Sequence, residues 1–491
     1  MNYKTRTKWT NDARNQEVYP LRIYEPSTID DLVSLIKLAE AEGVSVRAVG
    51  SGHSWSDVCL TPDYLLQPSG LTRVLKLDKT LTAAGVDSST LIEVESGIRL
   101  SELNDTLDKL GLALPNMGGF DGQTIAGVTA TSTHGSGIKY GPLPEIIESF
   151  EVVAAQGQIY RVERTAGITD PQAYKKKYLN RILVQNDDWY YAMGVAIGCL
   201  GVIYSVILRV TKAFWLEEKR VLSTWNQVKA DLERGDVLTQ NEHYELLLNP
   251  YEINGVRRCI VTTRNSIPKP TNLSPITSSR NILNEMLSSV PYIGDGLRLW
   301  MDLNPDSVPN MLNGVLKSMV EDSYINKSYN VFNIGAANNV ASYSAELGFP
   351  VSGTVYLDGI DHIFNIAAEA KANGHIVHSG PIAVRFVRGT KFHLSPQYGE
   401  NLNTAMVELI FVKDTVGCLE LMYKYETESY QFGGRPHWGQ VNSMTGSKAM
   451  LAKLYPKLGT WLEVREQLNP DGTFDSPFSK RVGLGEGPTM P

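Results

Sequence analysis

The sequence predicts an α+β protein of two or three domains, and three observations lead to this fold class. Its 491 residues are about three times the length of a typical domain. Helical and strand signals alternate along the first ~215 residues, whereas strands between about residues 213 and 414 mix apolar and polar side chains. A sheet with one covered face produces such mixing. We therefore expect an α/β first part followed by an α+β domain.

Each element of the first part rests on a local signal. Residues 26–42 place acidic residues after Ser27-Thr28 and apolar residues on one face, which predicts a helix ended by Gly43. Residues 44–49 form an apolar run too short for a helix, so they predict a strand that enters a glycine loop. The same order recurs in a strand at 91–94, a helix at 101–110 and a Gly/Thr-rich segment at 116–137.

The uncharged run from Tyr190 to Leu208 is long enough to span a bilayer. Three glycines interrupt it, and the β-branched residues after Gly201 favour a strand entered by a tight turn. We expect a buried helix, turn and strand here. No apolar stretch follows the basic N-terminus, so we expect no secretory signal.

The second part begins with strands expected at 244–248 and 260–263. A helix follows Asp414, and a glycine turn then leads into the Arg-Pro-His-Trp motif at 435–438. A last helix at 446–454 is expected to return to the first domain.

The composition narrows the possible partners. Hydrophobic residues make up 42% and charged residues 20%, as in an ordinary globular protein. A net charge of −7, without a basic run along one face, argues against nucleic acid or anionic membranes. Four scattered cysteines, without a Cys/His cluster, favour a reducing compartment and no metal site. We expect a cytoplasmic protein with a small, largely uncharged ligand.

Two glycine-rich segments are candidates for the binding of that ligand. The loop Gly50-Ser51-Gly52-His53-Ser54 lets the backbone approach a ligand and turn its N–H groups to one point, which suits a pyrophosphate. Trp55 replaces the third glycine of the usual dinucleotide fingerprint, so a plain turn is the alternative. The segment at 116–137 combines small donors with apolar residues that look buried, which favours a binding wall over a flexible loop.

Four stretches in the same order resemble one protein family. They are VRAVGSGHSWSD (46–57), GQTIAGVTATSTHGSG (122–137), GCLGVIYSVILRV (198–210) and RPHW (435–438). They are similar to the vanillyl-alcohol oxidase superfamily of flavoproteins, in particular to its sugar-lactone and alditol oxidase group, which includes L-gulono-1,4-lactone oxidase. The resemblance implies a bipartite fold: an FAD-binding domain of two α/β lobes (1–212), an α+β substrate (cap) domain with a mostly antiparallel sheet (213–420), and a C-terminal segment (421–491) returning to the FAD domain.

The resemblance also implies which residues bind FAD. The loop formed by Val49, Gly50, Ser51, Gly52, His53 and Ser54 would hold the pyrophosphate. Gly118, Gly127, Thr131, Thr133, Gly135 and Gly137 would line the ribityl and phosphate groups, and Gly201, Val202 and Ile203 would face the adenine. His53 occupies the place of a histidine that is often bonded covalently to the flavin 8α-methyl group. A neutral imidazole is a competent nucleophile for that bond; the alternative is a histidine that only hydrogen-bonds the loop.

The catalytic motifs of that family are only partly retained. Its Glu-x-Arg pair becomes Ala383 and Arg385, and its His-Trp-x-Lys element keeps His437 but has Gln440 in place of lysine. Arg385 would stabilise the anionic reduced flavin, and His437 is the leading candidate base, although it could instead only pack beneath the ring. Gln440 offers a neutral donor. Loss of activity and a changed substrate both explain the lost charges, and the intact flavin loops favour the second.

Other polar residues have weaker signals. Glu408 could replace the missing carboxylate, although a cross-strand paired glutamate is commoner, and His393 could also approach the pocket. His375 and His378, on a strand, would point to opposite faces, which argues against zinc.

These residues together predict an FAD-dependent oxidoreductase. It would take a hydride from a CH–OH group to flavin N5 and pass electrons to dioxygen, yielding hydrogen peroxide. The partners are therefore dioxygen and a small-molecule alcohol, either a sugar lactone or polyol or a more apolar natural product. A dehydrogenase with another acceptor and a flavin-binding protein without turnover are the alternatives.

Overall fold

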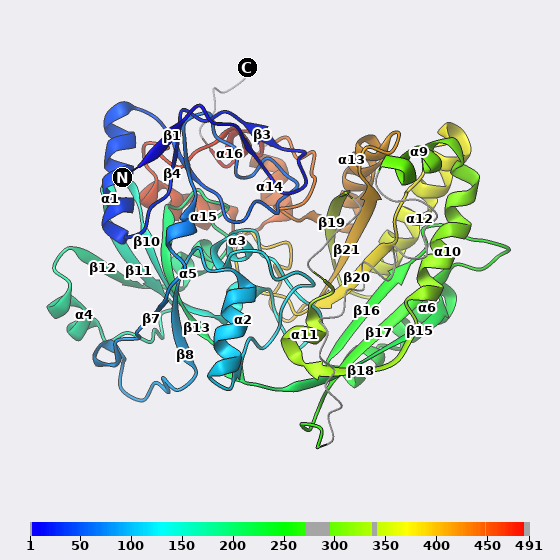
Figure 1. Cartoon of the computed structure of the whole chain (residues 1–491), viewed down its shortest axis with the longest axis horizontal. Coiled ribbons are helices and arrows are strands. Elements are labelled where there is room, and N and C mark those ends of the chain that lie inside the picture. The colour runs from blue at the N-terminus through cyan, green and yellow to red at the C-terminus, as the bar shows by residue number, and fades with distance from the viewer. Residues whose placement is uncertain (1, 272–294, 336–340, 447, 486–491) are drawn as a thin grey trace.

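The computed structural model describes residues 2–271, 295–335, 341–446 and 448–485, and it confirms the α+β class. Two halves lie side by side (Figure 1). One half holds a four-stranded and a six-stranded sheet, and the other half is built on an eight-stranded sheet. The C-terminal helices α14 (Lys448–Leu454), α15 (Leu458–Leu468) and α16 (Pro477–Arg481) lie in the first half, beside the N-terminal elements.

The four-stranded sheet carries the first glycine loop. Its order is β1 (Tyr3–Thr5), β4 (Arg22–Tyr24), β6 (Tyr64–Leu66) and β5 (Val46–Ala48), with the last three strands parallel. Helix α1 (Ile29–Glu42) confirms the first predicted helix, because Thr28 and Asp31 form a capping box and Gly43 ends it at a φ of 67°. Its apolar face packs on this sheet.

The uncharged run at residues 190–208 ends in a strand of the six-stranded sheet. Its order is β12 (Arg181–Gln185), β11 (Ile159–Glu163), β10 (Ile147–Val153), β13 (Val202–Arg209), β8 (Leu91–Glu95) and β7 (Val74–Leu75). Helix α5 (Asp187–Met193), a turn and β13 confirm the expected helix, turn and strand. Within the described ranges, no helix has both the length and the apolar character needed to cross a membrane.

The eight-stranded sheet has two chemically different faces. Its order is β18 (Glu321–Lys327), β15 (Trp215–Thr224), β17 (Arg258–Ile267), β16 (His243–Leu248), β20 (Ile382–Val387), β21 (Thr404–Val412), β19 (Ser342–Pro350) and β22 (Arg435–Pro436), all antiparallel. One face packs Leu246, Phe386 and Val407 in a core with helices α6 (Trp225–Arg234), α10 (Val308–Ser318), α12 (Val355–Gly374) and α13 (Cys418–Ser429). Because side chains alternate along a strand, the other face carries a different set of residues, and that set turns to the first half.

The remaining elements connect these layers. They are β2 (Trp9–Thr10), β3 (Glu17–Val18), β9 (Leu112–Ala113), β14 (Thr211–Lys212), α2 (Leu100–Lys109), α3 (Ile125–Ala130), α4 (Pro171–Lys177), α7 (Val237–Gln240), α9 (Asp295–Leu303) and α11 (Ser328–Phe332).

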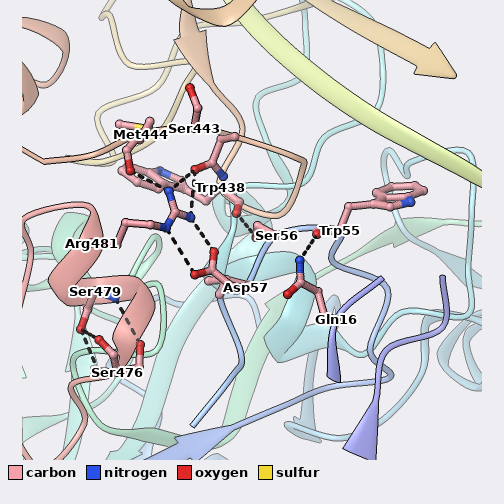
Figure 2. Close-up of polar contacts among 12 residues, drawn as sticks. Gln16, Trp55, Ser56, Asp57, Trp438, Ser443, Met444, Ser476, Ser479 and Arg481 are labelled. Carbon is pink, nitrogen blue, oxygen red and sulfur yellow. Dashed lines mark hydrogen bonds and ion pairs between the residues drawn. The ribbon is translucent and has the colours of Figure 1, made fainter. Parts of the chain in front are cut away.

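The C-terminal segment is tied to the N-terminal lobe by direct contacts. The N–H of Val46 donates to the carbonyl of Thr473 at 2.7 Å. Arg481 of α16 contacts Asp57, with Nε 3.3 Å from Oδ2, and Ser56 Oγ donates to the carbonyl of Trp438 at 2.7 Å (Figure 2). The motif at 435–438 is thereby fixed against the chain that leaves the first glycine loop.

Candidate active site

The loop after β5 presents a row of free backbone donors. The N–H of Val49 donates to Leu66, and that of Trp55 donates to Gly439 at 2.8 Å. Between them, the N–H groups of residues 50–54 have no acceptor in the described part of the chain. Gly52 has a φ of 78°, and a Cβ on Gly50 would collide with Thr124 Oγ1, so both positions require glycine. Consecutive unpaired N–H groups suit an anionic pyrophosphate.

The side chain of His53, in this loop, contacts one acidic and one aromatic residue. Its Nδ1 lies 3.3 Å from Asp12 Oδ2, and its ring meets Phe120 edge to face at 4.5 Å. Burial lowers the pKa of His53, Asp12 opposes this effect, and Arg99 adds to it. The imidazole is therefore neutral at pH 7, which is the form required of a nucleophile. Its covalent bond to the cofactor remains a prediction.

The second glycine segment is more ordered than a loop, because it contains helix α3. Thr124 caps the helix by accepting the N–H of Gly127 at 3.3 Å, and Ile125 and Val128 are buried, as expected. The N–H of Thr133 donates back to the carbonyl of Val128. The small residues thus lie on a folded wall.

Several of the predicted glycines lie where a larger side chain would not fit. A Cβ on Gly118 would lie 3.3 Å from the carbonyl of His134, and one on Gly135 would collide with Asn116. Gly137, at a φ of 99°, donates its N–H to Phe386 of β20 at 2.7 Å. Gly201, at a φ of 104°, would press a Cβ against the carbonyl of Val153 at 2.7 Å.

Val202 and Ile203 are buried at the start of β13. Contact between the adenine and the three residues 201–203 remains a prediction.

The predicted cofactor and catalytic residues meet at Gly439. A Cβ built there would lie 3.3 to 3.5 Å from Ser54 Oγ, His437 Cε1 and Thr131 Oγ1. The Oε1 atom of neighbouring Gln440 is buried and has no hydrogen-bond partner within the described residues. Because buried polar atoms are normally paired, this oxygen fits a contact with a bound group. Trp438 is fully buried and stacks on Tyr455, so it serves packing.

A chain of charges crosses the sheet face that turns to this point. Arg385 lies between two carboxylates, with Nε 3.7 Å from Glu245 and Nη1 3.8 Å from Glu408. Glu245 also pairs with Arg264 at 2.7 Å. Burial would raise the pKa of Glu245, but Arg264 and Arg385 lower it to about 2. Burial likewise works to lower the pKa of Arg385, but the surrounding carboxylates, led by Glu245, raise it. Arg385 is therefore a fixed cation, and Gly119 lies close to its guanidinium.

A second buried cluster joins the sheet to the second glycine segment. His134 Nε2 lies 3.1 Å from Glu346 Oε1, and His134 Nδ1 lies 2.9 Å from the carbonyl of Gly135. Burial alone would raise the pKa of Glu346, but His134, then His437 and Arg385, lower it to about 2. Glu346 is therefore ionised at pH 7, and both ring nitrogens of His134 face oxygen acceptors.

His437 is held beside that pair. The backbone N–H of His437 donates to the carbonyl of Glu346 at 2.9 Å. Its ring atom Nδ1 accepts the backbone N–H of Gly439 at 3.2 Å. Burial lowers the pKa of His437 to about 4, with Glu346 opposing and His134 assisting. The ring is neutral at pH 7 and carries its proton on Nε2, because Nδ1 is the acceptor.

The sequence alone missed three residues of this site. His134 lies within the quoted motif THGSG, whereas Glu245 and Glu346 are single glutamates in strands and give no local signal. Glu408 does lie next to Arg385, as considered. The expectation that His393 approaches the pocket was wrong. Its Nε2 lies 3.8 Å from Asp188, and its backbone N–H donates to the carbonyl of Tyr191 in α5.

The expectation of a strand at the two spaced histidines was also wrong. His375 ends helix α12 at a φ of 54°, and His378 stacks on Phe411 at 4.2 Å.

The chain is similar to known proteins over most of its length. A family model described as FAD binding domain matches residues 20–163, and one described as D-arabinono-1,4-lactone oxidase matches residues 206–482, more than half of the chain. L-gulonolactone oxidase of Mus musculus is 26% identical and covers 97% of this chain and 98% of its own. L-gulono-1,4-lactone dehydrogenase of Mycobacterium tuberculosis is 28% identical, with 96% and 98% covered.

Among solved structures, cholesterol oxidase from B. sterolicum aligns with a TM-score of 0.75 at 14% identity, covering 99% of this chain and 97% of that one. This likeness shows the fold alone. The two family matches agree in order and position with the glycine loops and with the sheet that faces them. The chain belongs to the D-arabinono-1,4-lactone oxidase family of FAD-dependent oxidoreductases.

Proposed function

We propose that this protein is an oxidase that dehydrogenates a carbinol of a sugar lactone and passes the electrons to dioxygen, yielding hydrogen peroxide in the cytoplasm. The proposal rests on one structural feature: both glycine segments and His437 meet at Gly439. The loop of free N–H donors at 50–54 is bonded through Trp55 to Gly439, and His437 and Thr131 meet at that same glycine. The relatives from mouse and from Mycobacterium tuberculosis, both named for a gulonolactone, support the substrate class.

The residues divide the work as follows. The loop at 49–54 would bind the FAD pyrophosphate, and His53 would tether the ring. Bound FAD supplies a hydride acceptor. Arg385, a permanent cation, would stabilise the negative charge that develops at the acceptor. Gln440 would donate a neutral hydrogen bond from its amide, the role left open by the absent lysine.

The charged sheet face supports a hydroxyl-rich substrate over an apolar alcohol. The side chains of Arg385, Glu245 and Glu408 are 19%, 19% and 17% exposed, so they remain accessible. Sugar hydroxyl groups can hydrogen-bond such side chains, whereas an apolar alcohol would desolvate them without replacing those bonds. The charge lost at Ala383 is therefore compensated by neighbouring strands, which favours an active enzyme over a protein that only binds flavin.

A substrate screen tests the proposal. Purified protein is mixed with aldonolactones, alditols and apolar secondary alcohols, and peroxide release is measured. The expected result is peroxide with at least one aldonolactone and none with apolar alcohols. Flavin bleaching by a lactone without peroxide in air, while an artificial electron acceptor restores turnover, would assign a dehydrogenase instead. Release with apolar alcohols alone would contradict the substrate class.

A further inference from the structure

Ala383 and Glu408 face each other across two neighbouring strands. The register of β20 and β21 pairs Ala383 with Glu408, and that of β21 and β19 pairs Glu408 with Glu346. Directly opposite residues of an antiparallel pair project from the same face, with Cβ atoms about 5 Å apart. Ala383 itself has no carboxyl group, and the carboxyl group that faces it is supplied by Glu408 of the next strand.

Glu408 is oriented by two contacts. Its Oε1 accepts the hydroxyl of Ser344 at 3.0 Å, and its Oε2 lies 3.8 Å from Arg385 Nη1. The side chain is 17% exposed, whereas that of Glu346 is 4% exposed. One oxygen is thus anchored, and the carboxyl group as a whole remains accessible beside the arginine.

The two facing carboxyl groups differ in proton affinity. Glu346 is held ionised by His134, as described above. Burial raises the pKa of Glu408, Arg385 opposes this, the charge of Glu346 adds to the rise, and Ser344 and His134 oppose it. Neighbouring carboxyl groups with separated pKa values commonly divide the roles of fixed charge and proton acceptor. Glu408 has the character of the acceptor.

His437 is a poorer proton acceptor than its place in the motif predicts. Its Nδ1 already accepts the N–H of Gly439, so the neutral ring presents Nε2–H, a donor. In this arrangement His437 can hydrogen-bond a substrate oxygen, but it has no free lone pair for the hydroxyl proton.

We infer that Glu408 is the catalytic base of the oxidation, acting from β21 in place of the carboxylate that position 383 lacks. The inference rests on the proposed function. The substrate O–H bond breaks and its proton bonds to a carboxylate oxygen of Glu408. The carbinol C–H bond breaks and its electron pair leaves with the hydrogen as hydride to bound FAD, and a C=O bond forms. Glu408 later returns its proton to water.

Rapid anaerobic mixing with the best aldonolactone tests this role. Glu408→Gln keeps the shape of the side chain and removes the base, so flavin bleaching should slow by about 100-fold or more while FAD content stays unchanged. Glu408→Asp, which keeps a shorter carboxylate, should give an intermediate rate. The matched control is Glu217→Gln, which also removes the acceptor of a serine hydroxyl but lies on β15 and projects from the other face. It should bleach at the parent rate.

A double variant that moves the carboxylate from β21 to β20 tests the role of Glu408 further. Ala383→Glu combined with Glu408→Gln places the carboxylate on β20 again and should recover at least 10-fold of the lost rate. The rate should fall in acid through the protonation of Glu408 in the parent, and that fall should be absent in Glu408→Gln. Infrared titration of the holoprotein without substrate gives an independent readout. Burial also raises the pKa of Glu93, Asp121 and Glu426, so the signal of Glu408 is taken from the difference between the parent and Glu408→Gln. This difference spectrum should contain a protonated carboxyl band that persists above the usual glutamate range.

The outcomes separate the two claims. Bleaching of the parent with an equal rate in Glu408→Gln would overturn the inference and leave the proposed function standing. A parent that no aldonolactone reduces would overturn the proposed function, and the base role with it. A difference spectrum between the parent and Glu408→Gln without such a band would likewise count against the proton acceptor assigned here.

Discussion

Replacement of the buried carboxylate Glu346 by glutamine should destabilise the protein in a pH-dependent way. The change keeps the size of the side chain but removes the charge that faces His134 at 3.1 Å. The pKa of Glu346 falls from 4.5 to about 2 in the folded protein. At about 1.4 kcal/mol per pKa unit, this fall sets an upper limit of roughly 3 kcal/mol on the stability gained from the ionised form, because His437, one of the groups that lower the pKa, is neutral at pH 7.

The direction of the pKa change determines the pH range in which the charge of Glu346 stabilises the fold. A lowered carboxyl pKa adds stability that is complete above about pH 4.5 and is lost as the pH falls towards about 2. The free energy of unfolding of Glu346→Gln should therefore lie below that of the parent at pH 7, by up to about 3 kcal/mol, and the difference should shrink below pH 4.5.

Urea unfolding followed by tryptophan fluorescence, from pH 7 to pH 3, measures this difference. The matched control is Glu428→Gln at the surface pair with His362, whose Nε2 lies 2.8 Å from the carboxylate and whose partners are 28% and 36% exposed. An exposed pair contributes at most about 1 kcal/mol. Equal losses in the two variants, or a difference for Glu346→Gln that does not change with pH, would show that the buried charge of Glu346 does not stabilise the fold.

Two predictions concern the flavin loop. His53→Ala should fold, yet release its FAD into the supernatant on acid precipitation, whereas the parent pellet stays yellow; a colourless parent pellet would contradict the covalent bond. In His53→Ala, which lacks the tether and can be freed of FAD, a further Gly50→Ala change should weaken FAD uptake by the apoprotein at least 10-fold, because the new methyl group collides with Thr124 Oγ1. Adding Thr124→Ala removes that atom and should restore part of the uptake; no recovery in fluorescence titration would show that the collision is not the cause.

The parts of the fold that could be predicted from the sequence depend on neighbouring residues. Helix α1 has its cap at Thr28 and its stop at Gly43 within one short segment. The first glycine loop could be recognised because Gly50 and Gly52 follow a strand and require small side chains for local reasons. The buried α5, turn and β13 could be read from the glycines that divide the run.

The catalytic face could not be predicted in the same way. Glu346 and Glu408 become neighbours only through the register of β19 and β21, which lie far apart in the chain. A single glutamate in a strand looks the same whether it faces solvent or a buried arginine. The strand expected at His375 failed because this residue takes the left-handed conformation that ends α12, a position more often held by glycine.

In the proposed function, the glycine loop and the charged sheet face form one site of oxidation. The most direct measurement is the anaerobic rate of flavin bleaching by an aldonolactone in the parent and in Arg385→Met at equal FAD content. The rate should be at least 100-fold lower in the variant, since the fixed cation beside Glu245 and Glu408 is lost. Equal rates in the two proteins would place the oxidation away from the charged sheet face.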